Sequence, residues 1–146
     1  MPMIVSMTAE YALRAMAQIA ALGDDGAMRA RDLSAMAHVP TPYLSKILRR
    51  LVAAGLLESE KGHGGGFRLT RSPSRITFAD IFRALGEEID QNRCAFGWGE
   101  CNKKNPCLLH PAFSELKTQL IAWAKRSTLA MAAADPALIS RGVRRG

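Results

Sequence analysis

At 146 residues, with 48% apolar and 23% charged residues, the chain has the composition of one globular domain and not that of a disordered chain. It contains no run of about 18 apolar residues, which excludes a membrane-spanning helix, and its first residues lack the pattern of a secretory signal. The 20 lysines and arginines exceed the 13 acidic residues and give a net charge of +7, which favours a polyanionic partner such as nucleic acid.

The first part of the chain predicts three helices. Alanine, leucine and methionine fill residues 8–22, which indicates a largely buried helix that ends at a Gly-Asp-Asp-Gly turn. A shorter helix is expected over residues 29–37, before a tight break that contains a proline. Thr41 then caps a third helix, Pro42 occupies its first helical position, and Gly55 ends it.

The third predicted helix is amphipathic. Its apolar residues recur at i, i+3, i+4 and i+7 and form one stripe: Leu44, Ile47, Leu48 and Leu51. Its other face carries hydroxyls and cations and no acids: Tyr43, Ser45, Lys46, Arg49 and Arg50. A solvated cationic face has the same composition, so this helix alone does not establish a function.

Two short strands around a glycine-rich loop predict a hairpin. Residues 56–60 and 67–70 flank the loop at 61–66, and Phe67 and Leu69 alternate with polar residues as in a half-buried strand. The loop lacks the last glycine of a dinucleotide fingerprint and the Gly-Lys-Ser/Thr of a P-loop. Glycine has no side chain, so a glycine-rich loop flanked by cations suits the wing of a DNA-binding domain, whose backbone approaches phosphate or the minor groove. An ordinary hairpin turn is the alternative.

The predicted elements have the order of a winged helix-turn-helix: helix, short helix, tight turn, helix and hairpin. This motif is a mainly α fold with a small β wing. In this motif the second helix of the pair enters the major groove of double-stranded DNA, and its N-terminal residues reach base edges. We therefore expect DNA contacts from the third helix and the wing, at Thr41, Tyr43, Ser45, Lys46, Arg49, Arg50, Lys61, His63, Gly64 and Arg68.

The second part of the chain predicts two more helices around an irregular segment. Thr77 caps a helix that ends at Gly86, and residues 87–109 are irregular. Pro111 starts a long helix over residues 111–134. Its near-heptad seam, at Phe113, Leu116, Leu120, Trp123, Ser127 and Ala130, favours a dimerisation helix over one packed on its own core.

All three cysteines, Cys94, Cys101 and Cys107, lie in the irregular segment, and His110 follows them. An odd cysteine count in a chain without a secretory signal favours a reducing, cytoplasmic environment. Thiolate and imidazole suit iron–sulfur clusters and zinc, but zinc sites usually begin with cysteines two to four residues apart. The longer segments between these cysteines can wrap more easily around a cluster, which is larger than a single metal ion. Buried small cysteines, an oxidant-sensing thiol pair and a zinc site remain alternatives.

Several stretches resemble the IscR/NsrR family of bacterial regulators. They are Tyr11-Ala-Leu-Arg14, Tyr43-Leu44, the GLLESEKGHGGGFRL stretch from Gly55 to Leu69, and the cysteine cluster followed by Leu-Leu-His-Pro. The resemblance runs over about residues 3–130. It implies a homodimeric winged-helix transcription regulator whose DNA affinity depends on an iron–sulfur cluster that senses nitric oxide, redox state, or iron or cluster supply. A two-fold dimer implies an inverted-repeat operator.

The resemblance also implies a ligand set. IscR-like members use a histidine separated from the third cysteine by two residues, and His110 occupies that place, which favours a 2Fe–2S cluster. NsrR-like members use an acid of the partner subunit's first helix; Glu10 matches it and would favour 4Fe–4S. A related variant pairs that acid with a histidine where Arg14 stands, which argues against it. The first cysteine gap has six residues where IscR-like members typically have five, and we prefer His110.

These expectations divide the chain into four segments. Residues 1–86 form the DNA-binding domain, 87–110 the cluster-binding loop, 111–134 the dimerisation helix and 135–146 a flexible basic tail. The histidines lie in no nucleophile–base arrangement, so we expect neither an enzyme nor a small-molecule substrate. The rival hypotheses are a zinc-stabilised or metal-independent DNA-binding protein, a thiol-based redox sensor, and an iron–sulfur chaperone that docks through the long helix.

Overall fold

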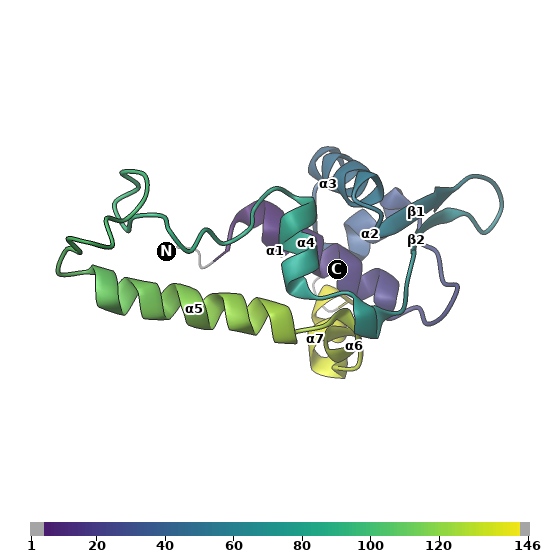
Figure 1. The fold of residues 1–146 in the computed structure, drawn as a ribbon. Helices are drawn as coiled ribbons and strands as arrows, with labels where there is room; N and C mark the ends of the chain where they lie inside the picture. The colour runs from purple at the N-terminus through teal and green to yellow at the C-terminus, as the bar shows by residue number, and fades with distance from the viewer. Residues whose placement is uncertain (1–4, 144–146) are drawn as a thin grey trace.

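The computed structural model describes residues 5–143 and places them in two parts, a winged-helix body and an arm (Figure 1). The arm consists of one long helix and the irregular segment that leads to it, and it extends away from the body. No helix within this described range is both long and apolar enough to cross a bilayer.

Three helices form the centre of the body: α1 (Met7–Ala20), α2 (Ala30–Ala37) and α3 (Thr41–Ala53). The predicted apolar stripe of α3 is buried completely against α1 and α2. Burial of each leucine in such a core contributes about 1.5–3 kcal/mol relative to exposure. The prediction of Thr41 as the cap is wrong: Pro40 takes that place, because its carbonyl accepts the first helical bond, from the amide of Leu44 at 3.0 Å.

The predicted hairpin is present as β1 (Leu57–Glu60) and β2 (Gly66–Leu69), paired antiparallel with Leu57 opposite Leu69. The glycines of its turn are required by close backbone approach. A Cβ on Gly65 would lie 2.3 Å from the carbonyl oxygen of Glu60, and one on Gly66 would lie 2.5 Å from the carbonyl carbon of Met28. Met28 also pairs with Phe67, so the segment before α2 extends the small sheet.

A short 3-10 helix, η1 (Pro73–Arg75), leads from the hairpin to α4 (Phe78–Ala84). The predicted cap of α4 is confirmed: Thr77 and Asp80 form a reciprocal capping box, in which each side chain accepts from the other residue's amide at 3.1 and 2.9 Å. Ile81, Phe82 and Leu85 bury the apolar face of α4 in the body core.

The long helix is shorter than the sequence predicts. α5 (His110–Arg126) stops eight residues before the expected end, and α6 (Leu129–Ala133) follows as a separate helix. The residues between them extend and pair with the body: the amide of Phe78 donates to the Ser127 carbonyl at 2.9 Å, and the amide of Leu129 donates to the Ile76 carbonyl at 2.9 Å. The expected seam positions Ser127 and Ala130 therefore lie outside α5.

The expected flexible basic tail is also wrong over most of its length, because residues Pro136–Val143 form α7. Asp135 caps this helix by accepting from the Ala137 amide at 3.0 Å, and the Gln18 side-chain amide donates to the Ile139 carbonyl at 3.2 Å. The helix packs on α6 and α2. Asp-Pro is a helix-start signal, although it also reads as a break. Arg144 and Arg145 lie outside the described residues.

Candidate DNA-binding surface and cysteine loop

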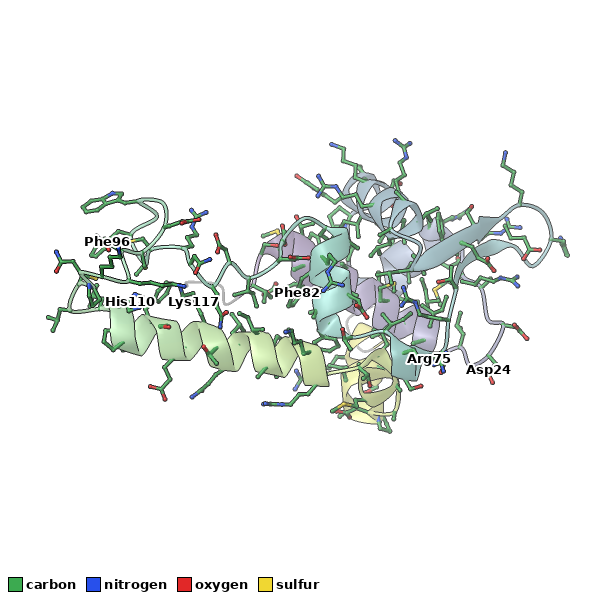
Figure 2. All side chains as sticks on the ribbon, viewed as in Figure 1. Asp24, Arg75, Phe82, Phe96, His110 and Lys117 are labelled. Carbon is green, nitrogen blue, oxygen red and sulfur yellow. The ribbon has the colours of Figure 1, made fainter. Side chains whose placement is uncertain are left out.

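The outer face of α3 presents three of the predicted DNA contacts to solvent. Tyr43 is 62% exposed, and Lys46 and Arg49, one turn apart, are also exposed. None of the hydrogen bonds or ion pairs among the described residues involves these three side chains, so their polar groups are available to a ligand. Figure 2 shows nitrogen-tipped side chains that project from α3 and from the hairpin away from the body. Ser45 is half-buried.

Three other predicted contacts are engaged within the protein. The Arg50 guanidinium donates to the Leu85 carbonyl at 3.2 Å and so joins α3 to α4. Arg68 forms an ion pair with Glu60 across the hairpin. Thr41 donates its hydroxyl to the Ser34 hydroxyl at 3.1 Å. All three were predicted from charge or polarity, whereas their partners lie on other elements, 35, 8 and 7 positions away, and were not predictable from the periodicity of one helix or strand.

The tip of the hairpin is exposed at Lys61, His63 and Gly64 and projects from the body (Figure 1). Its shape depends on a residue that the sequence did not single out: the Arg29 guanidinium donates to the Gly62 carbonyl at 3.0 Å. Gly62 and Gly64 both adopt positive φ, at 99° and 75°, a conformation that side chains disfavour. The wing tip is therefore a defined turn that carries two protonatable side chains.

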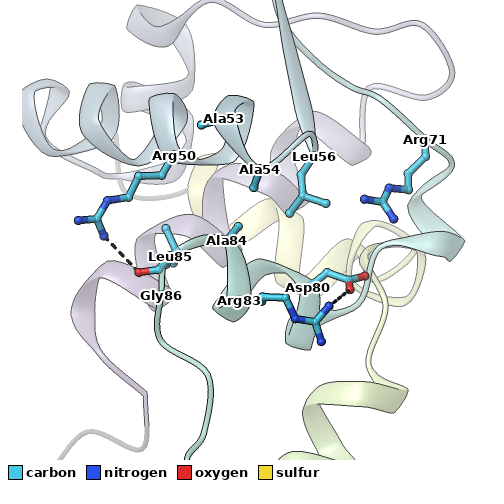
Figure 3. A pocket seen from close by; sticks show the side chains of 10 residues that line it. All are labelled: Arg50, Ala53, Ala54, Leu56, Arg71, Asp80, Arg83, Ala84, Leu85 and Gly86. Carbon is cyan, nitrogen blue, oxygen red and sulfur yellow. Dashed lines mark hydrogen bonds and ion pairs between the residues drawn. The ribbon is translucent and has the colours of Figure 1, made fainter.

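A groove of about 510 Å³ between α3 and α4 was also not expected from the sequence (Figure 3). Its floor is apolar, and three arginines, Arg50, Arg71 and Arg83, line it. Arg83 is neutralised by Asp80 at 3.6 Å and Glu88 at 2.7 Å. The bond from Arg50 to the Leu85 carbonyl engages the guanidinium but does not neutralise it, and Arg71 forms no ion pair among the described residues, so the groove keeps a positive charge.

The cysteine loop of the arm is a tight turn closed by backbone bonds. Arg93 and Glu100 form an antiparallel bridge, the Cys94 amide donates to the Gly99 carbonyl at 2.8 Å, and the Cys101 amide donates to the Asn92 carbonyl at 2.7 Å. These bonds bring Cys94 and Cys101 together at the two ends of the turn.

Backbone amides also surround the sulfur of Cys94. The Phe96 amide donates to Cys94 Sγ at 3.4 Å. This bond is the largest of the effects that hold the pKa of Cys94 below its usual range. The amides of Trp98 and Gly97 and the thiol of Cys101 also lower the pKa, whereas desolvation raises it. Amide donors that stabilise a thiolate also suit a sulfur that ligates metal.

The other two predicted ligands lie at the start of α5. Cys107 is exposed, and the amide of the half-buried His110 donates to its carbonyl at 3.1 Å. Among the described residues, no group of three or more histidine, cysteine or acidic side chains is close enough to hold a metal ion. The structure therefore brings Cys94 and Cys101 together but does not gather all four residues. The donor set, three thiols and one imidazole on one loop, has the chemistry of an iron–sulfur site.

The arm also exposes large apolar side chains. Phe96 and Trp98 stack with their ring centroids 5.4 Å apart, and Trp98 is 83% exposed. Leu108 is 95% exposed and Leu116, on α5, is 61% exposed. These exposed apolar side chains make the arm a candidate interaction surface. The near-heptad pattern predicted the exposure of Leu116, whereas no periodic signal identified the aromatic pair.

Comparisons with known proteins agree with this architecture. The sequence profile of the Rrf2 family, described as iron-dependent transcriptional regulators, matches residues 5–135. An HTH-type transcriptional regulator of Aquifex aeolicus is 33% identical over 129 residues, which cover 87% of this chain and 89% of that protein. The HTH-type transcriptional regulator IscR of Klebsiella pneumoniae is 31% identical over 119 residues, 82% of this chain and 72% of its own length.

Solved structures show the same fold. CymR, the global cysteine regulator of B. subtilis, superimposes with a TM-score of 0.77 at 22% identity, over 91% of this chain and 98% of that one. IscR of T. potens gives a TM-score of 0.72 at 24% identity, over 92% and 90%. The relatives are transcription regulators and not enzymes, in agreement with the sequence-based expectation. The chain belongs to the Rrf2 family of iron-dependent transcriptional regulators.

Proposed function

We propose that this transcription regulator is a homodimer whose affinity for an inverted-repeat operator is controlled by an iron–sulfur cluster. Cys94, Cys101 and Cys107 hold the cluster and His110 completes the site. The observation that carries the proposal is the turn that brings Cys94 and Cys101 together and directs backbone amides at the Cys94 sulfur. Membership of a family described as iron-dependent supports it.

A cluster bound here would supply a group that reacts with oxidants and nitric oxide and changes charge on reduction. The residues of the chain bind and orient it. Cys94 and Cys101 are already together, and the loop between Cys101 and His110, exposed at most positions, must bring Cys107 and His110 to them. Three thiolates with one imidazole favour a 2Fe–2S cluster over 4Fe–4S, because mixed cysteine and histidine ligation is best known on two-iron clusters.

DNA recognition is assigned to the outer face of α3 and to the wing. Tyr43, Lys46 and Arg49 are exposed and unpaired in the described part of the chain, and so can meet base edges or phosphates in the major groove. Lys61 and His63 at the wing tip are placed to meet the adjacent backbone or minor groove. Arg50 and Arg68, which have partners inside the protein, contribute less.

The dimer is assigned to α5. Leu116 is exposed on it, and the aromatic pair of the cysteine loop adds apolar surface on the same arm. A second copy of α5 with its own apolar face would cover this surface in the manner of paired helices. Because α5 runs from His110 to the bridge at Ser127, it connects the cysteine loop directly to the start of α4 in the body. Cluster occupancy can therefore alter the spacing of the two DNA-binding domains.

A thiol-based sensor is the second candidate, and the proximity of Cys94 and Cys101 favours it. In this reaction two thiols lose two protons and two electrons to a peroxide and form one disulfide, while the peroxide is reduced to water or an alcohol. Cys107 and His110 would then have no part in sensing.

Anaerobic reconstitution with ferrous iron and sulfide separates the two candidates. The cluster proposal predicts a brown protein that absorbs between about 320 and 420 nm, and each single cysteine-to-serine variant should lose this absorbance. His110→Ala should shift the spectrum or accelerate cluster loss, with His63→Ala as the matched control. A colourless protein whose DNA affinity changes only on peroxide treatment contradicts the cluster. If Glu10→Ala destroys the cluster while His110→Ala has no effect, the fourth ligand is the carboxylate of Glu10 of the partner subunit.

A further inference from the structure

Lys117 of α5 is buried although both of its sequence neighbours face solvent. It is 6% exposed, and its ammonium donates to the carbonyls of Gln91 and Arg93, each at 2.7 Å. The ammonium also lies 4.7 Å from the centroid of the Phe113 ring. In Figure 2, Lys117 points from α5 toward the irregular segment beside it. Lysine is almost never buried this fully unless its charge has a partner.

The charge of Lys117 has no acidic partner in the described part of the protein, where every ion pair involves Arg68 or Arg83. Two carbonyl oxygens and an aromatic face solvate the ammonium but do not neutralise it. A buried cation without a counter-ion is unfavourable. The cost is reduced if an anionic group forms nearby, and Cys94 directly follows the Arg93 carbonyl that Lys117 binds.

The segment that Lys117 holds is the first side of the cysteine loop. Between its two bonded carbonyls lies Asn92, whose own carbonyl accepts the amide of Cys101 at 2.7 Å. The Gln91 side chain adds a bond to the Thr118 hydroxyl at 3.3 Å, again from α5. Residues 91–93 are therefore fixed by α5 on one side and by the returning strand of the loop on the other.

We propose that Lys117 is a positioning residue of the sensory site. It clamps residues 91–93 to α5, which keeps Cys94 and Cys101 together before any cluster is bound. Its positive charge then balances the thiolate ligands of the loaded site. The charge role rests on the proposed function, whereas the clamp does not. Because the clamp is built on α5, a change at the cysteines acts directly on the proposed dimerisation helix.

Hydrogen–deuterium exchange of the reduced, metal-free protein tests the clamp. Lys117→Met keeps the length of the side chain and removes its charge, and Lys125→Met is the matched control on the exposed face of α5. We expect the amides of Cys94 and Cys101 to exchange about tenfold faster or more in Lys117→Met, the effect of losing a charge-assisted hydrogen bond. Lys117→Arg should restore much of the protection.

Unchanged protection of these two amides in Lys117→Met overturns the clamp, as does a wild-type protein in which they are already unprotected. Protection of the α3 amides reports whether the variant still folds, because α3 lies in the body. A loss of protection throughout α3 would also overturn the assignment, since it would make Lys117 a general stability residue. Faster exchange confined to residues 91–101 supports it.

The reduction potential of the reconstituted protein tests the charge role. Removing a nearby positive charge disfavours the more negative reduced cluster, so Lys117→Met should lower the potential, while Lys117→Arg and Lys125→Met should leave it close to the wild-type value. An unchanged potential in Lys117→Met overturns the charge role. If the wild-type protein takes up no iron, the proposed function and the charge role both fail, whereas the exchange experiment still decides the clamp.

Discussion

The body and the arm of this protein are stabilised in different ways. In the body, apolar residues of α1, α2, α3, α4 and α6 share one buried core. In the arm, none of residues 87–109 is buried, and the segment is fixed by backbone bonds and by Lys117. The comparison indicates that the body supplies most of the folding free energy, and the arm supplies sulfur chemistry and contact surface. Segments with few buried apolar contacts open most easily, which suits a part that must respond to a signal.

The largest expected effect contrasts the two parts directly. Leu48→Ala, in the body core, should lower the free energy of unfolding by about 2–5 kcal/mol, because it leaves a cavity among fully buried side chains. Leu108→Ala, at a highly exposed position of the arm, should change it by less than about 0.5 kcal/mol. Urea unfolding measures both. Similar losses for the two variants would show that the arm is part of the cooperative core.

The next expected effect concerns the assembly. Leu116→Asp should weaken the dimer about 30-fold or more, equivalent to roughly 2 kcal/mol, because it introduces an unpaired charge into an apolar interface. Sedimentation equilibrium measures the dissociation constant, with Gln119→Asp as the control at an exposed polar position of α5. A Leu116→Asp protein that stays as dimeric as the control would place the interface elsewhere.

DNA binding should distinguish residues that are exposed on α3 from those engaged inside the body. Lys46→Ala or Arg49→Ala should weaken operator binding by about 1–3 kcal/mol where the side chain contacts a base, and lower the salt slope by about one where it contacts phosphate. Arg50→Ala should have a smaller effect on affinity, because its guanidinium is bonded to Leu85. Fluorescence anisotropy at several salt concentrations gives both quantities, with Arg126→Ala as the control on the arm.

Equal affinities for wild type, Lys46→Ala and Arg49→Ala would exclude the outer face of α3 as the reading surface. A larger loss for Arg50→Ala than for the other two would show that the bond to Leu85 opens when DNA binds. Either result can be interpreted as an effect on DNA binding, because none of these three side chains lies in the buried core.

The smallest expected effect is the loss of a helix cap. Thr77→Ala removes the acceptor of the capping box at the start of α4 and should cost about 1 kcal/mol of folding free energy. Thr70→Ala, at an exposed position, serves as a comparison outside any helix, although it removes the bond from its hydroxyl to the Gly55 carbonyl. No change in the midpoint of urea unfolding for Thr77→Ala would show that the start of α4 is held by its bridge to Thr128 alone.

Features set by neighbouring residues were predictable from the sequence. The buried stripe of α3 follows from apolar spacing, and the cap of α4 follows from threonine and aspartate three residues apart. Features set by distant residues were not. α5 ends at Arg126 because Ser127 and Leu129 bond to residues about 50 positions earlier, and the local signal is a single threonine, Thr128, which caps α6 by accepting from the Met131 amide.

The candidate site shows the same limit. Spacing and residue type identified the three cysteines and His110, but not the amides that surround the Cys94 sulfur, which depend on the turn at residues 96–98. No sequence pattern distinguishes the buried Lys117 from the exposed Lys125. The difference arises because residues 91–93 pass beside Lys117 and bond to its ammonium. Likewise, Arg50 and Lys46 are both cationic residues of α3. Arg50 is engaged inside the protein because the Leu85 carbonyl lies within hydrogen-bond distance of its guanidinium.

The most direct test of the central claim is the operator affinity of the reconstituted protein and of the metal-free, reduced protein, measured anaerobically on the same DNA. The cluster proposal predicts that the two affinities differ about tenfold or more, equivalent to a coupling free energy of roughly 1.4 kcal/mol. It also predicts that Cys94→Ser behaves as the metal-free protein in both preparations. Equal affinities for the two forms of the wild-type protein, with a cluster demonstrably bound, would contradict the claim that the cluster controls DNA binding.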